Sequence, residues 1–233
     1  MGISSPASAQ TVQTAPSVRD LVTQAADDAR RLVSTDSALI LSIGGVGAAL
    51  GHLGDHGLSD NMSRSGSLKN LFAPGETLGG ARMQTAGALA TYTIGRVTAN
   101  DRVARVGADL IRAQLVTQTI TGAIKTAVGR TRPDGAHYSF PSGHAAATFA
   151  SATVLQRNLG WKVGVPAYAV AGYVAASRIQ VRRHFLSDVA FGAAVGIAAG
   201  RTVTIGRGTR RFALAPTALA GGGGVSLTWI GSN

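Results

Sequence analysis

Three glycines spaced by four residues, Gly192, Gly196 and Gly200, lie in an apolar segment that is rich in alanine. Residues four apart share one face of a helix, so the spacing predicts a helix over residues 184–200 with a smooth strip along it. Such a strip lets a second backbone approach closely, which occurs both in membranes and in dense soluble cores. The feature therefore predicts closely packed helices.

The composition agrees with this fold class. Aromatic residues make up only 5% of the 233 residues, glutamate occurs once (Glu76), and cysteine is absent. A chain of this length can bury a substantial core as one domain. Without cysteine it can form neither a disulfide framework nor a thiolate metal site. We expect an all-α fold with a core of small side chains.

Apolar periodicity and capping signals place the expected helices, and we predict a compact bundle of about six to seven. The expected helices cover residues 17–33, 37–53, 76–97, 101–128, 142–157, 161–177 and 184–200. Residues 54–75, rich in Gly, Ser, Asn and Asp, are predicted to be a loop.

Both ends of the chain differ from this bundle. Residues 1–16 predict a disordered tail, because they are polar and lack an apolar signal-peptide core. Residues 17–200 are expected to form the helical domain. Residues 201–233 predict a short β-like C-terminal hairpin or tail, because residues 225–229 alternate in polarity after a run of four glycines.

Positive charge gathers in the second half of the chain. The net charge is +11, of which residues 135–233 contribute +8 with one acidic residue, Asp188. A basic surface attracts phosphate, nucleic acid or anionic lipid. The chain lacks the interleaved aromatic residues of single-strand binders and any recognisable DNA-reading motif, so a purely nucleic-acid-binding role is not expected.

Asp188 follows His184 by four residues at the start of the last expected helix. On a helix the carboxylate can reach the imidazole, fix its tautomer and leave the other ring nitrogen free to attack or bind a ligand. The alternative reading is an acidic residue that interacts with the helix dipole beside an incidental histidine.

Two further clusters make the catalytic reading the stronger one. Pro141-Ser142-Gly143-His144 leads directly into a helix, whose N-terminal N–H groups form a natural anion site. Ser142 can donate a hydroxyl, Gly143 lets a ligand approach the backbone, and His144 suits proton transfer near neutral pH. Lys125, Arg132 and Arg178 add cations, two of which are forked donors that match phosphoryl oxygens.

Together these clusters resemble the signature of the type-2 phosphatidic acid phosphatase superfamily. Its three parts, Lys-x6-Arg-Pro, Pro-Ser-Gly-His and Ser-Arg-x5-His-x3-Asp, are all present over residues 125–188. The resemblance implies a metal-independent phosphatase with an all-helical core and no cofactor. It also implies that vanadate would inhibit the enzyme. It implies a phosphohistidine at His184, oriented by Asp188, and leaving-group protonation by His144. The implied phosphate-binding residues are Lys125, Arg132, Ser142, Gly143 and Arg178.

Substrate and location stay open at this level. The expected partner is a phosphorylated small molecule or a lipid phosphate or diphosphate. The uncharged stretches, such as the 15 residues of 163–177, are shorter than the roughly 20 needed to span a bilayer. We therefore expect a soluble or membrane-associated domain on the periplasmic or extracellular side, with an integral lipid phosphatase as the alternative. The signature also resembles vanadium-dependent haloperoxidases, although those chains are typically much larger.

Overall fold

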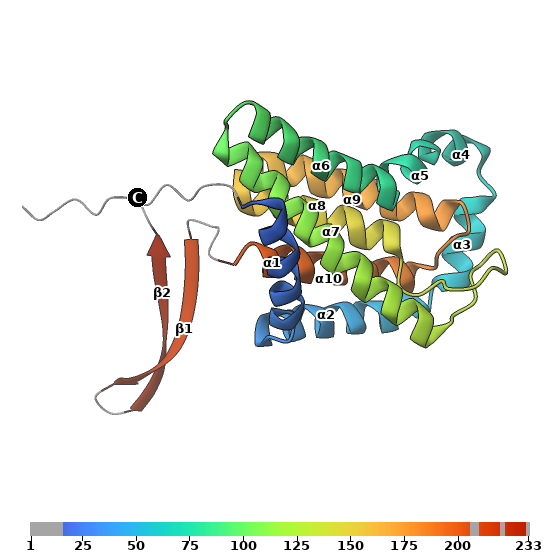
Figure 1. Ribbon diagram of the computed structural model, residues 1–233. Helices are drawn as coiled ribbons and strands as arrows, with labels where there is room; N and C mark the ends of the chain where they lie inside the picture. Colours follow the sequence, from blue (N-terminus) through green and yellow to red (C-terminus); the bar gives the residue numbers. More distant parts are fainter. Residues whose placement is uncertain (1–15, 206–209, 220–221, 232–233) are drawn as a thin grey trace, which may run out of the picture.

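The structure, a computed structural model, describes residues 16–205, 210–219 and 222–231. The predicted disordered tail thus lies outside the described residues, except for Pro16. Within them the chain forms ten helices and two strands (Figure 1). The helices are α1 (Val18–Arg31), α2 (Thr35–His52), α3 (Asp55–Ser63), α4 (Gly66–Phe72), α5 (Pro74–Gly79), α6 (Ala81–Val97), α7 (Asp101–Val128), α8 (Gly143–Leu159), α9 (Trp161–Gln180) and α10 (Leu186–Val203).

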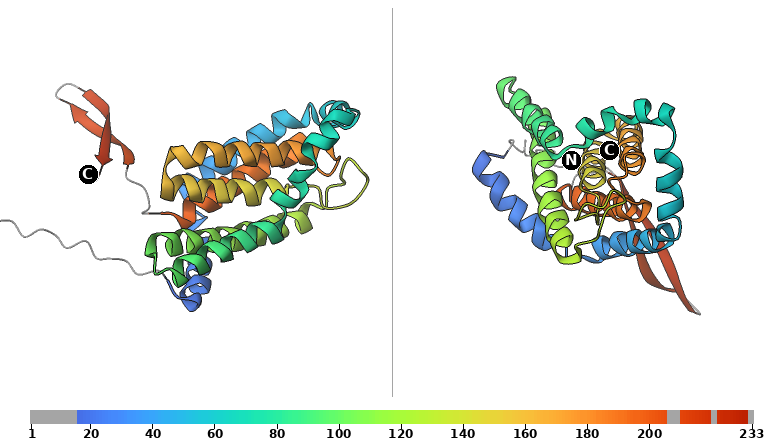
Figure 2. Two further views of the ribbon diagram at one scale, coloured as in Figure 1. Left: turned by 90° about the horizontal axis from the view of Figure 1, so that it is seen from above. Right: turned by 90° about the vertical axis from the view of Figure 1, so that its right-hand side faces the viewer.

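Helix α10 lies in the middle of the bundle, packed against α2, α7 and α8 (Figures 1 and 2). Its three glycines face backbone and side chains of α8 and its N-cap. A Cβ added at Gly196 would lie 2.2 Å from the carbonyl oxygen of Ala146, and one at Gly192 would lie 2.6 Å from that of Ser142. The predicted close packing along this strip is confirmed. The all-α bundle is confirmed as well.

Helix α7 forms the long edge of the core, and its ends follow the capping signals. The side chain of Asn100 accepts a hydrogen bond from the backbone N–H of Val103, and Gly129 ends the helix at φ 62°. Its buried face includes Val106, Leu110 and Val116, which pack with α8 and α10 residues. The helix thereby brings its last turn, with Lys125, to the end of the bundle where α8 and α10 begin.

The prediction of a loop over residues 54–75 is wrong. This segment holds α3, α4 and the start of α5, and the expected helix over 76–97 is divided at Gly80, whose backbone is extended. The residues that suggested turns act as helix starts: the Ser65 side chain caps α4, and Pro74 occupies the first turn of α5. These short helices pack against α9 at one end of the bundle (Figure 1).

The C-terminal residues form the predicted hairpin. Strand β1 (Arg210–Leu219) pairs antiparallel with β2 (Gly222–Gly231), and Leu219 lies opposite Gly222 in the register. Three of the four consecutive glycines fall within β2. The hairpin is a separate element of secondary structure after the last helix.

One described helix, α10, is long and apolar enough to cross a membrane, and 67% of that segment is buried inside the bundle. Helices α1 and α2 pass the same test only when they are taken together, and they meet at an angle of 68°.

Candidate active site

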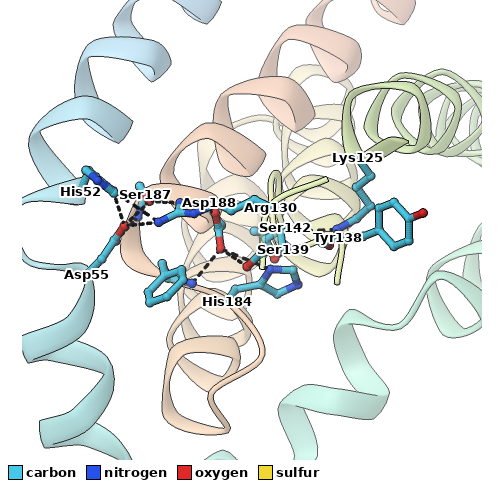
Figure 3. Close-up of polar contacts among 12 residues, drawn as sticks. His52, Asp55, Lys125, Arg130, Tyr138, Ser139, Ser142, His184, Ser187 and Asp188 are labelled. Atoms are coloured by element: carbon cyan, nitrogen blue, oxygen red, sulfur yellow. Dashed lines mark hydrogen bonds and ion pairs between the residues drawn. The ribbon is translucent and has the colours of Figure 1, made fainter. Parts of the chain in front are cut away.

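The predicted site residues gather at the end of the bundle where α7 and α9 end and α8 and α10 begin (Figure 3). His184 lies in the short connection between α9 and α10, Asp188 in the first turn of α10, and Lys125 in the last turn of α7. Arg178 lies in the last turn of α9, while Ser142 caps α8. Residues far apart in the sequence are thus brought to one place by four helix ends.

His184 precedes α10 rather than lying on it, because the helix begins at Leu186. The expected helical spacing of His184 and Asp188 is therefore wrong, although the two side chains still meet. Ring atom Nδ1 lies 3.7 Å from Asp188 Oδ2, just beyond hydrogen-bonding distance. The His184 backbone N–H donates to the Arg178 carbonyl at 3.1 Å, which fixes the connection against the end of α9.

Asp188 is completely buried and held by several donors. The Ser139 hydroxyl and the Phe185 backbone N–H (2.8 Å) donate to Oδ2, and Arg130 donates to Oδ1 at 2.7 Å. Burial alone would raise the pKa of Asp188, but the His184 ring and these donors outweigh burial and hold the pKa below its usual value. Asp188 is therefore an ionised carboxylate with a fixed orientation.

His184 is 3% exposed, and its burial lowers its pKa to about 4. The Asp188 carboxylate acts in the opposite direction, while Lys125 and Arg132 lower the pKa further. The imidazole is consequently neutral at physiological pH, which is the form that can act as a nucleophile.

The N-terminus of α8 lies beside this pair. Ser142 is buried, its hydroxyl accepts from the Ala145 N–H at 3.4 Å, and its own N–H donates to the Asp188 carbonyl at 2.9 Å. A Cβ added at Gly143 would lie 3.9 Å from the aliphatic chain of Lys125. Gly143 thus leaves its backbone close to a lysine, at the positive end of a helix.

The cations of the site have different surroundings. Lys125 Nζ donates to the Tyr138 carbonyl at 2.7 Å, and burial lowers its pKa to about 8, with a contribution from Arg132. Arg178 is 3% exposed and donates from Nη1 to a carboxylate oxygen of Glu76 on α5. A cleft of about 200 Å³ is lined by Gly143, His144 and residues of α7 that include Lys125.

His144, in the first turn of α8, faces the same carboxylate. Its Nε2 lies 3.6 Å from Glu76 Oε1. Burial lowers the pKa of His144 and Arg178 adds to this, while Glu76 raises it. The imidazole and Arg178 therefore share one counter-ion at the mouth of the site.

Sequence reasoning missed four residues that complete the arrangement: Asp55, Glu76, Arg130 and Ser139. Arg130 lies at a variable position of the first motif, and its side chain is only 22% exposed and contacts both Asp55 and Asp188. One available signal was that Glu76 is the only glutamate in the chain. Asp55 lies 132 residues before Ser187, its partner, and no local pattern connects them.

Comparison with known proteins agrees with the motifs. Residues 107–212 match the model of the PAP2 superfamily, so the resemblance stated from the sequence is confirmed over that segment. The chain is 48% identical over 87 residues to a lipid A 1-phosphatase of Porphyromonas gingivalis, which covers 35% of this chain and 19% of the relative. It is 36% identical over 107 residues to a decaprenylphosphoryl-5-phosphoribose phosphatase of Mycobacterium tuberculosis, covering 41% and 59%.

A lipid A 4'-phosphatase of Helicobacter pylori is 29% identical over 114 residues, covering 44% of this chain and 58% of that protein. The chain thus spans between 19% and 59% of the length of these curated relatives.

Two solved structures share the fold. Aquifex aeolicus LpxE has a TM-score of 0.55 at 23% identity, over 65% of this chain and 94% of that one. A transmembrane PAP2-type phosphatidylglycerolphosphate phosphatase from Bacillus subtilis has a TM-score of 0.52 at 18% identity, over 80% and 93%. The chain therefore shares its helical fold with these two structures.

Proposed function

Since residues 107–212 of this chain are a PAP2-superfamily segment, we propose that the protein is a phosphatase that forms a phosphohistidine at His184. The observation that carries the proposal is a buried, neutral imidazole beside an ionised carboxylate, within the field of Lys125 and Arg132. A neutral imidazole can attack phosphorus, and fixed cations stabilise the charge that gathers on the equatorial oxygens.

The reaction has two steps. In the first, His184 Nε2 forms a bond to phosphorus while the bond to the leaving oxygen breaks, and His144 gives its proton to that oxygen. Asp188 stabilises the positive charge that develops on the His184 ring. In the second step a water oxygen attacks phosphorus, the P–N bond breaks, and neutral His144 takes the proton of the water.

Five residues bind the phosphoryl group in this proposal: Lys125, Arg132, Ser142, Gly143 and Arg178. Arg178 pairs with Glu76 here, so a phosphoryl oxygen has to take the place of that carboxylate. Bidentate guanidinium groups favour this exchange, because they bind phosphate oxygens as strongly as carboxylate oxygens. The chain's own cations perform the charge stabilisation, so the reaction requires no metal ion.

We propose a phosphorylated lipid as the substrate, hydrolysed at a membrane surface on the periplasmic or extracellular side. The names of the relatives all describe phosphates on lipids or lipid-linked sugars. Helix α2 and its C-cap residue Leu53 support a lipid surface, because one face presents large aliphatic side chains that are 61–86% exposed. These residues, called the α2 apolar face below, are Leu39, Ile43, Val46, Leu50 and Leu53.

A substrate panel tests the proposal. Released phosphate is measured for lipid phosphates in detergent and for soluble monoesters, each with and without EDTA and vanadate. We expect activity that survives EDTA, is inhibited by vanadate and is higher on the lipid substrates. His184→Ala should lower turnover by at least about 10³-fold, because it removes the nucleophile. The matched control is His137→Ala, since His137 is an exposed histidine of the neighbouring loop.

Turnover by His184→Ala at the wild-type rate would exclude the phosphohistidine. Higher activity on soluble monoesters than on lipids would instead exclude the lipid substrate and leave the chemistry in place. The first result tests the phosphohistidine chemistry, and the second tests the identity of the substrate.

A further inference from the structure

We propose that Asp55 and Arg130 are positioning residues that hold Asp188, and through it His184, in the reactive geometry. The inference rests on the proposed phosphatase function and adds to it two residues that lie outside the fixed positions of the three sequence motifs. They come from α3 and from the connection after α7, and Figure 3 shows them next to Asp188 and Ser187.

Arg130 bridges two buried carboxylates. Its Nη1 donates to Asp188 Oδ1 and to Ser187 Oγ, each at 2.7 Å, while Nη2 donates to Asp55 Oδ2 at 2.8 Å. The guanidinium carbon lies 4.4 Å from the centre of the Phe185 ring, so the group is also held from one face. These contacts hold the planar Arg130 guanidinium in one orientation. The guanidinium in turn fixes the position of Asp188 Oδ1.

Asp55 fastens the first turn of α10 to α3. Its Oδ1 accepts from the Ser187 N–H at 2.9 Å, and its Oδ2 accepts from the Ser187 hydroxyl at 2.6 Å. His52 Nδ1 lies 2.9 Å from the same oxygen. Asp55 is fully buried, and a buried carboxylate is retained only where donors and an opposite charge compensate its desolvation. Two of its partners, Arg130 and Ser187, are direct neighbours of Asp188.

The distance between His184 and Asp188 explains why this support matters. At 3.7 Å the ring and the carboxylate are a few tenths of an ångström from a hydrogen bond. A small displacement of Asp188 therefore decides whether the carboxylate stabilises the charged ring. Asp55 also offsets the charge of Arg130, so that Asp188 is not fully neutralised by its own support.

The chain contains a control ion pair that also starts from α3. Asp60, also on α3, forms an ion pair of 2.7 Å with Arg182, which lies two residues before His184. Both side chains are 44% exposed, and the bonds of Arg182 go to Asp60 and to the Pro133 carbonyl rather than to Asp188. Asp60→Asn removes the same charge from the same helix, without touching the support of Asp188.

The test compares Asp55→Asn with Asp60→Asn, using steady-state kinetics of the purified full chain on the best substrate of the panel. Turnover is normalised to active sites counted by the burst of product. Loss of a supporting residue behind a reactive group typically costs about 10–100-fold. We expect kcat of Asp55→Asn to fall by about that factor with KM within about threefold, while Asp60→Asn stays within about twofold of the wild type.

A loss of kcat that is equal in the two variants, or a change confined to KM, would overturn the proposal. Should Asp55→Asn fail to fold, Ser187→Ala replaces it, because that change removes one hydrogen bond each from Asp55 and Arg130. Its expected loss of kcat is smaller than 10-fold and again exceeds that of Asp60→Asn.

Nitrogen-15 spectra of the histidine side chains give a readout that needs no turnover. With Asp188 in place the proton of His184 resides on Nδ1, and Asp55→Asn should move this signal while Asp60→Asn leaves it unchanged. An unmoved His184 signal overturns the positioning role. A moved signal in a protein that hydrolyses no phosphate supports the positioning role and excludes the phosphatase.

Discussion

At the scale of single residues, Glu76 partly offsets the lowering of the His144 pKa by burial. Its carboxylate opposes burial and Arg178, both of which lower the pKa of His144. Glu76→Gln should therefore lower the pKa of His144 further. A general acid is active below its pKa and is lost as the pH rises through it, so the basic limb of the pH–rate profile should move to lower pH.

Initial rates from acidic to basic pH, measured for both proteins, check this direction. The acidic limb, which reports protonation of His184, serves as the internal reference. A basic limb that stays in place or moves to higher pH would show that Glu76 does not raise the pKa of the group that this limb reports.

Some residues of the site could be predicted from the sequence and others could not. Lys125, Ser142, His144, His184 and Asp188 were accessible, because each lies in a short motif whose chemistry is local. The supporting residues Asp55 and Glu76 were not predicted, since their partners are more than a hundred positions away and no local motif links the members of each pair. Ion pairs that form only through tertiary packing require the fold.

At the scale of elements, α8 and α10 are in contact because Gly196 has no side chain. A Cβ there would lie 2.2 Å from the Ala146 carbonyl oxygen and 2.8 Å from the Ala150 nitrogen, and both are backbone atoms that cannot rotate away. Gly196→Ala should therefore lower the free energy of unfolding by about 1–3 kcal/mol or more. Chemical denaturation followed by circular dichroism measures the change.

The matched variant is Gly172→Ala in α9, where an added Cβ has no neighbour within 4 Å. It should leave stability unchanged or raise it by up to about 1 kcal/mol, because alanine favours the helix. Equal destabilisation by both variants would mean that the contact of α8 with α10 is not the cause.

The long helices of the core were predicted from the sequence, whereas the short helices α3, α4 and α5 were not. Residues 101–128 carry a complete cap at each end and a long apolar period, so the expected bounds agree with α7. Between residues 54 and 79 the helices are 6–9 residues long. Helices this short lack a readable period, and their stability comes from packing on α9 rather than from their own sequence.

At the scale of the whole molecule, the α2 apolar face lies opposite the face that packs on α10. The small residues Gly44 and Gly51 allow that packing, and a Cβ at Gly44 would lie 2.2 Å from the side chain of Ala194. The large residues are thereby directed outward. We expect the protein to bind anionic vesicles, since its net charge is +11 and the exposed face is aliphatic.

Replacing Ile43 and Leu50 together by serine should weaken vesicle binding about 100-fold or more, because burial of each side chain contributes about 1.5–3 kcal/mol. Co-sedimentation with vesicles measures the affinity. Leu115→Ser, at a leucine of α7 that is 46% exposed, is the control. Equal effects of the two changes would mean that α2 is not the lipid-facing element.

The pairing of Glu76 with Arg178 has a consequence for the end of the proposed catalytic cycle. An arginine that already holds a counter-ion exchanges one anion for another when substrate arrives, and it can make the reverse exchange when inorganic phosphate departs. The carboxylate then competes with the product for the same guanidinium. We therefore expect inorganic phosphate to inhibit the proposed phosphatase only weakly, because Glu76 already neutralises Arg178 in the vacant site.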